Sequence, residues 1–433
     1  MKKVIPILLL ALLPNPPANA QVADLVLDSR VVQGAQLLEC SQTSAETNWS
    51  FKLHDEQIRV PQESLLRWGG WTLAAHPNPA VWLIDGSWLS GEITFHSNDT
   101  LSIENAWLDI PTIPLTAVRG IVFQPPHSFQ HWMETMNWME STQGSADWLR
   151  HVDGTVRTGI IRQWPQSSED SRDTFDGEDR TLQISNLALR NATPQTQMQQ
   201  VLRIAEIESV VISPQLIGPV PPSAPITLTL QDGSRLRCQQ MVMDGPRLKF
   251  VLAAGLSVTS LDSRLVFLTG ITGIVCHNET SRLAFLSDLE PANYRYVSDS
   301  TLSWKLGRDQ DCLGHTLLGR DSHGQWIRVP KGIATHSRSQ VAYRWDGKPA
   351  NFLAQIARAS GASGIVECKI LLAKAGQLRV ASSFRLDNTT EEAFVDVDLT
   401  DAQLLVLLTE PAELGSYGDH VLWLDARICR AID

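Results

Sequence analysis

The chain has 433 residues, of which 43% are hydrophobic and 19% charged, and its formal net charge is −11. This length is enough for about two to four domains, each with its own core. The apolar fraction excludes a disordered chain, and the absence of long apolar runs excludes a protein that spans a membrane several times. The acidic balance argues against a general nucleic-acid binder, because neutralising phosphates requires a basic surface.

The first twenty residues have the pattern of a secretory signal. Two lysines precede a short apolar run from Ile5 to Leu13, and the small residues Ala18 and Ala20 are typical of a cleavage site. The apolar run is shorter than the roughly 20 residues that a membrane span needs. We therefore expect a cleaved signal at 1–20 and a secreted or periplasmic protein that associates with a membrane only through this segment before cleavage. An uncleaved interfacial anchor is the alternative.

After the signal, apolar and polar residues alternate with the period of β-strands. The tripeptides Asp-Gly-Ser at 85–87 and 232–234 each lie between two alternating runs, as in a β-hairpin, and Asp-Gly-Thr at 153–155 is a weaker copy. The repeat of roughly 70 residues is typical of tandem small β units, such as barrels of about five strands. One irregular β-sandwich with shared Asp-Gly turns is the alternative.

One helix is expected, over residues 128–141. Ser128 is a suitable N-cap. An apolar stripe lies on one helical face and consists of Phe129, Trp132, Met133, Met136 and Met139. Such a stripe is much more often a helix packed on a sheet than a ligand site, so we expect it to belong to the core. Residues 166–180 are polar and predict an exposed loop, and the Pro-rich residues 219–225 predict a linker.

The chain has six cysteines and no pair with Cys-x-x-Cys spacing, so neither a zinc ribbon nor a thioredoxin-type motif is expected. In an exported protein an even number of cysteines permits disulfides, and buried free thiols are the alternative. The residues alone leave both open. The cysteines are Cys40, Cys238, Cys276, Cys312, Cys368 and Cys429.

The composition changes from about Ser281, and two motifs stand out. The first is GIATHSRS at 332–339, which enters a strand-like run, and the second is DHVLWLDAR at 419–427. In this order they resemble the G-I-x-x-H-x-x-S and D-H-x-x-W-x-D-A-[R/K] elements of NPCBM/NEW2 domains, a family of carbohydrate-binding modules related to family 51. The resemblance covers residues 281–433. It implies a galactose-binding-like jelly-roll β-sandwich of the kind usually appended to secreted glycosidases.

The sequence departs from this family after the strand-like run at 352–356. The family usually carries an acidic turn of the G-V-D-D kind there, whereas residues 357–361 read ARASG. A carboxylate is therefore absent from this turn. If relatives use that carboxylate as a metal or sugar ligand, the contact is lost in this chain.

Sugar recognition combines an aromatic ring that stacks on a pyranose with carboxylate acceptors and with Arg or His donors. On a strand, Asp419, Trp423 and Asp425 would share one face and His420 the other. A structural role is the alternative, with Trp423 in the core and the polar groups bound to loop backbone. We predict six ligand-binding residues in the two motifs: His336, Arg338, Asp419, His420, Trp423 and Asp425.

Catalysis has little support in the sequence. No nucleophile elbow, zinc-protease helix, P-loop or dinucleotide fingerprint is present, and the alternating strands and helices of a glycosidase barrel are missing. We expect no catalytic residue, no metal site and no cofactor, with structural calcium left open.

The fold class expected is all-β. We expect β units at 21–125 and 219–280, a helix with a second β unit at 126–218, and the jelly-roll sandwich at 281–433. The first functional hypothesis is a secreted, non-catalytic protein that binds carbohydrate through this sandwich. A structural or adhesive envelope protein that uses its β units for protein contacts is the second, and an enzyme with a site in residues 21–280 is the third.

Overall fold

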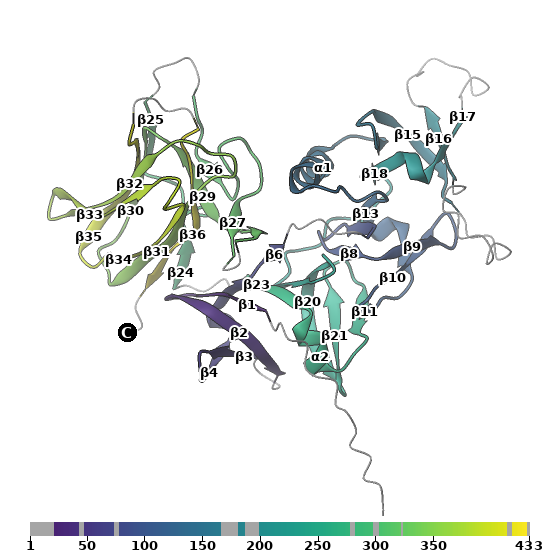
Figure 1. Cartoon of the computed structure of the whole chain (residues 1–433), viewed down its shortest axis with the longest axis horizontal. Helices are drawn as coiled ribbons and strands as arrows, with labels where there is room; N and C mark the ends of the chain where they lie inside the picture. Colours follow the sequence, from purple (N-terminus) through teal and green to yellow (C-terminus); the bar gives the residue numbers. More distant parts are fainter. Residues whose placement is uncertain are drawn as a thin grey trace, which may run out of the picture.

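The computed structural model describes residues 21–42, 47–72, 78–165, 181–186, 199–277, 282–297, 303–321, 324–413 and 418–430. The expected signal at 1–20 and the expected loop at 166–180 lie outside the described residues. Figure 1 shows a molecule built almost entirely of strands, which confirms the all-β class. In the described part of the chain, no helix is both long and apolar enough to cross a membrane.

The N-terminal part contains strands β1 to β23. Nineteen of the described strands form one antiparallel hydrogen-bonded network. The strands are β1 (Val22–Leu27), β2 (Val31–Gln42), β3 (Thr47–Leu53), β4 (Glu56–Pro61), β5 (Leu65–Gly69), β6 (Trp71–Thr72), β7 (Ala80–Leu83), β8 (Trp88–Ser90), β9 (Glu92–Phe95), β10 (Thr100–Glu104), β11 (Leu108–Asp109), β12 (Ile113–Pro114), β13 (Val118–Val122), β14 (Asp147–His151), β15 (Val156–Gln163), β16 (Thr181–Asn186), β17 (Gln199–Arg203), β18 (Ile207–Val211), β19 (Ile226–Leu230), β20 (Arg235–Asp244), β21 (Arg247–Leu252), β22 (Ser257–Ser260) and β23 (Ile271–Cys276).

The three Asp-Gly turns close the hairpins β7–β8, β14–β15 and β19–β20. In the first, the carboxylate of Asp85 accepts a hydrogen bond from the backbone N–H of Ser87 at 2.7 Å, and Gly86 has a φ of 85°. That left-handed conformation is the one that glycine adopts without strain. Strands far apart in the sequence also pair, since β23 lies beside β5 and β20 beside β8. The first and last thirds of the N-terminal part are therefore interlocked.

Helix α1 (Phe129–Ser141) forms where the sequence predicts it, with the Ser128 hydroxyl accepting a hydrogen bond from the N–H of His131 at 3.2 Å. Trp132, Met136 and Met139 are buried against the sheet, as expected of a core-facing stripe. A second, short helix, α2 (Arg264–Thr269), was not expected. Short apolar runs fit a strand or a helix equally well, and here tertiary packing decides.

All six cysteines are free thiols, which decides between the two alternatives. Five are buried and Cys312 is partly buried. Burial raises the pKa of Cys40 and of Cys312 to about 12, so both stay protonated at neutral pH. They contribute to the packing as small apolar side chains.

The C-terminal part is a sandwich of two antiparallel sheets, as expected. One sheet has the order β26-β29-β36-β31-β34, with β24 also paired to β36, and the other has the order β25-β30-β35-β32-β33. The strands are β24 (Leu283–Phe285), β25 (Asn293–Tyr296), β26 (Gly307–Arg308), β27 (Leu318–Arg320), β28 (Trp326–Arg328), β29 (Gly332–His336), β30 (Ser339–Arg344), β31 (Ala350–Arg358), β32 (Val366–Lys374), β33 (Gln377–Leu386), β34 (Glu392–Asp398), β35 (Ala402–Pro411) and β36 (His420–Arg430).

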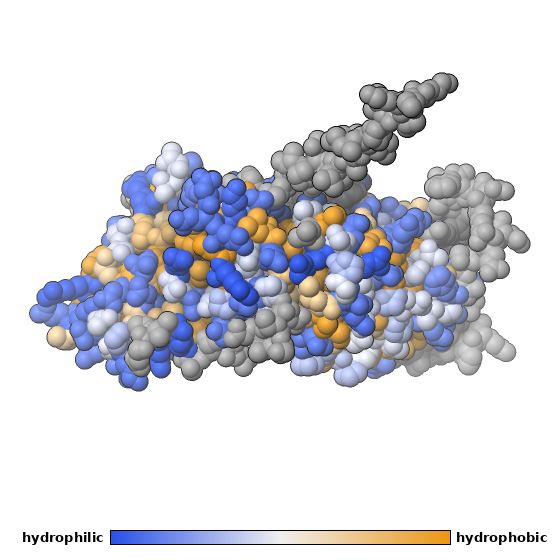
Figure 2. All heavy atoms as spheres, turned by 90° about the horizontal axis from the view of Figure 1, so that it is seen from below, coloured by the Kyte–Doolittle hydropathy of each residue, from blue (hydrophilic) through white to orange (hydrophobic). Residues whose placement is uncertain are grey.

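The two parts are firmly joined at a surface that we call the junction. Strand β28 pairs with β6, so the hairpin β27–β28 and a strand of the N-terminal part form one small sheet. The Arg67 guanidinium bonds the Asp425 carboxylate at 2.8 Å, and both side chains are buried. Arg427, also buried, donates to the carbonyl oxygen of Leu27 at 2.7 Å. In the view of Figure 2, hydrophilic residues predominate on the surface and hydrophobic ones show between them.

Candidate functional site

The two C-terminal motifs lie side by side. Strands β29 and β36 pair antiparallel, and the register places His336 directly opposite His420. Directly opposed residues of two strands project from the same face of a sheet. The pairing therefore brings together one predicted ligand residue from each motif.

The two histidines form an aromatic group with Trp304 and Tyr296, which we call the histidine–tryptophan cluster. The Trp304 ring stacks on His336 with centroids 5.0 Å apart and lies edge-on to His420 at 4.8 Å. Tyr296 is edge-on to His336 at 5.9 Å. His336 is buried, whereas the other three side chains are half-buried. The cluster thus combines aromatic rings with polar ring nitrogens at one end of the sandwich.

Burial lowers the pKa of both His336 and His420, so both rings are neutral at pH 7. His336 Nδ1 lies 3.2 Å from the carbonyl oxygen of Ser337. Because a carbonyl can only accept, Nδ1 carries the hydrogen and Nε2 is left as an acceptor.

Asp419 and Arg338 lie beside the cluster. Asp419 is buried, its carbonyl accepts a hydrogen bond from the Ser337 N–H at 3.0 Å, and its Oδ2 has no hydrogen-bond partner of normal geometry. Burial raises the pKa of Asp419, and the neighbouring Ser337 hydroxyl and the Arg338 guanidinium oppose this shift. Arg338 has a φ of 65° in the tight turn between β29 and β30.

The structure places the other two predicted residues elsewhere. Trp423 is 0% exposed in the sandwich core, and its Nε1 donates to the Thr335 hydroxyl at 3.1 Å, so its ring offers no face to a sugar. Asp425 pairs with Arg67 in the junction. The expected common face of Asp419, Trp423 and Asp425 fails because Asp425 has a φ of 48°, which breaks the alternation of the strand.

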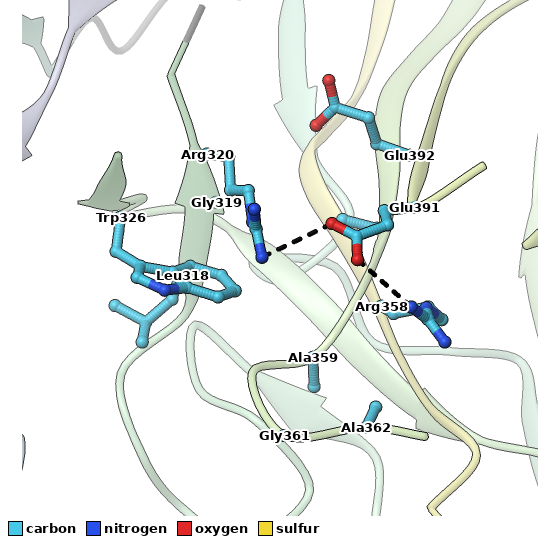
Figure 3. A pocket seen from close by; sticks show the side chains of 11 residues that line it. Leu318, Gly319, Arg320, Trp326, Arg358, Ala359, Gly361, Ala362, Glu391 and Glu392 are labelled. Carbon is cyan, nitrogen blue, oxygen red and sulfur yellow. Dashed lines mark hydrogen bonds and ion pairs between the residues drawn. The ribbon is translucent and has the colours of Figure 1, made fainter. Parts of the chain in front are cut away.

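A second feature is a small pocket beside the hairpin β27–β28, which we call the Trp326 pocket. Figure 3 shows Trp326 and Leu318 on one side, Glu391 and Arg358 on the other, and the turn after β31 below. Its volume is about 80 Å³. The pocket is lined by Leu318, Gly319, Arg320, Trp326, Ala357, Arg358, Ala359, Gly361, Ala362, Glu391 and Glu392.

Charged side chains organise this pocket. The Arg320 guanidinium lies 4.6 Å from the centroid of the Trp326 ring. Glu391 accepts ion pairs from Arg320 at 3.4 Å and from Arg358 at 3.3 Å. Arg358 is the last residue of β31 and directly precedes the turn in which the sequence departs from the resembled family by lacking a carboxylate.

Neither Trp304 nor the Trp326 pocket was among the residues predicted to bind a ligand. Trp304 lies outside both motifs, and its contact with the histidines arises from long-range packing. The pocket joins segments that are separated by up to about seventy positions, from Leu318 to Glu392. The only local signal was the altered turn at 357–361.

The chain is similar in structure to a carbohydrate-binding module of family 51 from Clostridium perfringens in complex with methyl-galactose, with 20% identity over 34% of this chain and 99% of that chain and a TM-score of 0.29. A second such module with its adjoining domain, from a Clostridium perfringens protein in complex with GlcNAc, gives 16% identity over 47% of this chain and 43% of that chain, with a TM-score of 0.30.

Tandem family 51 modules of a family 98 glycoside hydrolase from Streptococcus pneumoniae give 12% identity over 68% of this chain and 90% of that chain, with a TM-score of 0.29. No match is found among curated proteins. The model of the NPCBM/NEW2 domain family matches residues 283–429. Residues 283–429 of the C-terminal sandwich therefore match the family that the two motifs resemble.

Proposed function

We propose that the chain is an exported, non-catalytic protein that binds carbohydrate through its C-terminal sandwich, and that the sugar contacts the histidine–tryptophan cluster. The family match of residues 283–429 supports the class of ligand. The signal pattern at 1–20 supports export. The observation that carries the choice of site is the contact between two histidines, one from each motif, with Trp304 against both rings and Tyr296 against His336.

The cluster has the groups that a pyranose requires. Trp304 and Tyr296 are half-buried, so part of each aromatic ring is available to the apolar C–H face of a sugar. The neutral ring nitrogens of His336 and His420 can exchange hydrogen bonds with hydroxyl groups. A sugar bound here would displace water from these polar groups and replace its hydrogen bonds, which is what gives a site specificity.

The test is binding of the full-length mature protein to a glycan array, followed by calorimetry with the best ligand. We expect Trp304→Ala to weaken binding by roughly tenfold or more, since a stacked ring contributes about 1 kcal/mol beyond the area it buries. Trp345→Ala is the matched control, because Trp345 is a half-buried tryptophan of the same sandwich next to the far end of β30. Equal losses in the two variants, or no binding to any glycan, would overturn the proposal.

The glycan array, together with sedimentation and fractionation of the unmodified protein, addresses the envelope-protein hypothesis. If the array stays empty while the chain self-associates or sediments with envelope fractions independently of sugar, the β units act in protein contacts instead.

A further inference from the structure

We propose that the Trp326 pocket receives the acetamido group of an N-acetylated sugar. This inference rests on the proposed function, because it assigns part of a carbohydrate to a second place on the same sandwich. The pocket is separate from the histidine–tryptophan cluster but adjoins it. The Ala359 N–H in the pocket wall donates to the carbonyl oxygen of His420 at 3.0 Å.

The size of the pocket selects a substituent and not a whole ring. Its volume of about 80 Å³ is far below the roughly 300 Å³ at which pockets enclose complete small molecules. The sugar ring would stay at the mouth, where the side chains of Arg320 and Glu391 are 42% and 45% exposed.

The walls have one apolar and one polar side. Leu318, Ala357, Ala359 and Ala362 present aliphatic carbon atoms, to which the Trp326 ring adds an aromatic edge. The polar side has donors and an acceptor close together, because both arginines approach the carboxylate of Glu391. A group that fits must carry a carbon end, a donor and an acceptor within a few bonds.

The charges argue against an anionic substituent. The lining has two cationic side chains, Arg320 and Arg358, and two carboxylates, Glu391 and Glu392, so the formal charges cancel. Glu392 is already held by the Gln355 amide at 2.8 Å. A carboxylate or sulfate on the sugar would therefore face repulsion from Glu391 with no net positive charge to offset it.

An acetamido group has a complementary partner on both the apolar and the polar side of the pocket. Its methyl group meets the alanines and Leu318, its N–H donates to Glu391, and its carbonyl oxygen accepts from an arginine. The donor within reach belongs to Arg320, whose side chain is 42% exposed at the mouth of the pocket. A hydroxymethyl group would leave the apolar wall without a partner.

The experiment compares two matched pairs of sugars on the full-length protein: N-acetylglucosamine with glucose, and N-acetylgalactosamine with galactose. Saturation-transfer NMR and competition titrations give contacts and relative affinities. We expect at least one N-acetylated sugar to bind roughly tenfold more tightly than its partner. We also expect its acetamido methyl protons to receive the strongest saturation, a readout that needs no variant.

Ala362→Leu should fill the pocket and abolish the preference while leaving the affinity for the unacetylated sugar within about twofold. Ser360→Leu is the matched control, because Ser360 is exposed in the same turn and does not line the pocket. Sugars that bind equally with and without the acetamido group would overturn this inference and leave the proposed function intact. Absence of binding to all four sugars and to the glycan array would overturn both.

Discussion

Buried and half-buried histidines make the stability of this molecule depend on pH. His277, at the end of β23, lies 3.3 Å from the Thr227 hydroxyl, and burial followed by nearby positive charges lowers its pKa from 6.5 to about 4. His336 and His420 shift in the same direction. The unfolded chain therefore binds more protons than the folded chain below pH 6.5, and the free energy of unfolding falls as the pH falls.

We predict that His277 alone removes up to about 3 kcal/mol of stability as the pH falls from 6.5 to 4. Urea unfolding at several pH values measures this loss. His277→Gln removes the titrating group and should flatten the pH dependence. His127→Gln, at an exposed histidine, should leave it unchanged. Equal slopes for the two variants would contradict the assignment.

At the same scale, the site could be predicted only in part. The two motifs bring these residues together, because the paired strands β29 and β36 carry His336 and His420, and Arg338 and Asp419 adjoin the ends of those strands. Asp425 could not be placed from the period of a strand, since one left-handed residue redirects its side chain toward Arg67. Nothing local distinguishes a tryptophan that closes the core from one that covers a pair of histidines.

At the scale of elements, local signals explain which parts of the fold could be predicted. The three hairpins and helix α1 are specified by residues close together in sequence, namely Asp-Gly turns and a capped apolar stripe. Helix α2 has no side-chain cap hydrogen bond and runs for six residues. The pairing of β23 with β5 could not be predicted, because it joins segments about two hundred positions apart and depends on the whole core.

The cap of helix α1 gives a direct prediction. Ser128→Ala should lower the free energy of unfolding by about 1 kcal/mol, because the N–H of His131 loses its acceptor. Thermal and urea unfolding measure the change. Ser128→Thr keeps a hydroxyl at this position and should recover most of the stability. If the alanine and threonine variants unfold alike, the capping bond makes no contribution.

At the scale of the whole molecule, the junction holds the N-terminal part and the sandwich together. It combines a shared sheet, the buried Arg67–Asp425 ion pair and the bonds of Arg427 to backbone carbonyl groups. Arg328 also bonds Glu140 of helix α1 at 3.0 Å. We therefore expect the two parts to unfold together.

Arg67→Ala should cost about 3–5 kcal/mol, because it leaves the Asp425 carboxylate buried without its partner. Replacing both residues, as Arg67→Met with Asp425→Asn, should restore part of this loss, because asparagine is uncharged and tolerates the left-handed φ of 48° at position 425. Arg203→Ala is the control, since its ion pair with Glu206 is exposed and should change stability by less than about 1 kcal/mol. Denaturant unfolding of the three proteins checks the order, and a small effect of Arg67→Ala would contradict it.

The hairpin β27–β28 lies within the residues that match the NPCBM/NEW2 family, yet it completes its sheet with β6 from outside them. Fusing residues 283–429 to an unrelated protein would leave the edge of strand β28 unpaired and would expose Asp425 and Arg427. We therefore do not expect residues 283–429 to fold as an independent, transferable domain. Because the shared sheet and the buried Arg67–Asp425 pair fix the sandwich against the N-terminal part, a ligand bound as proposed would be held in one orientation relative to the rest of the chain.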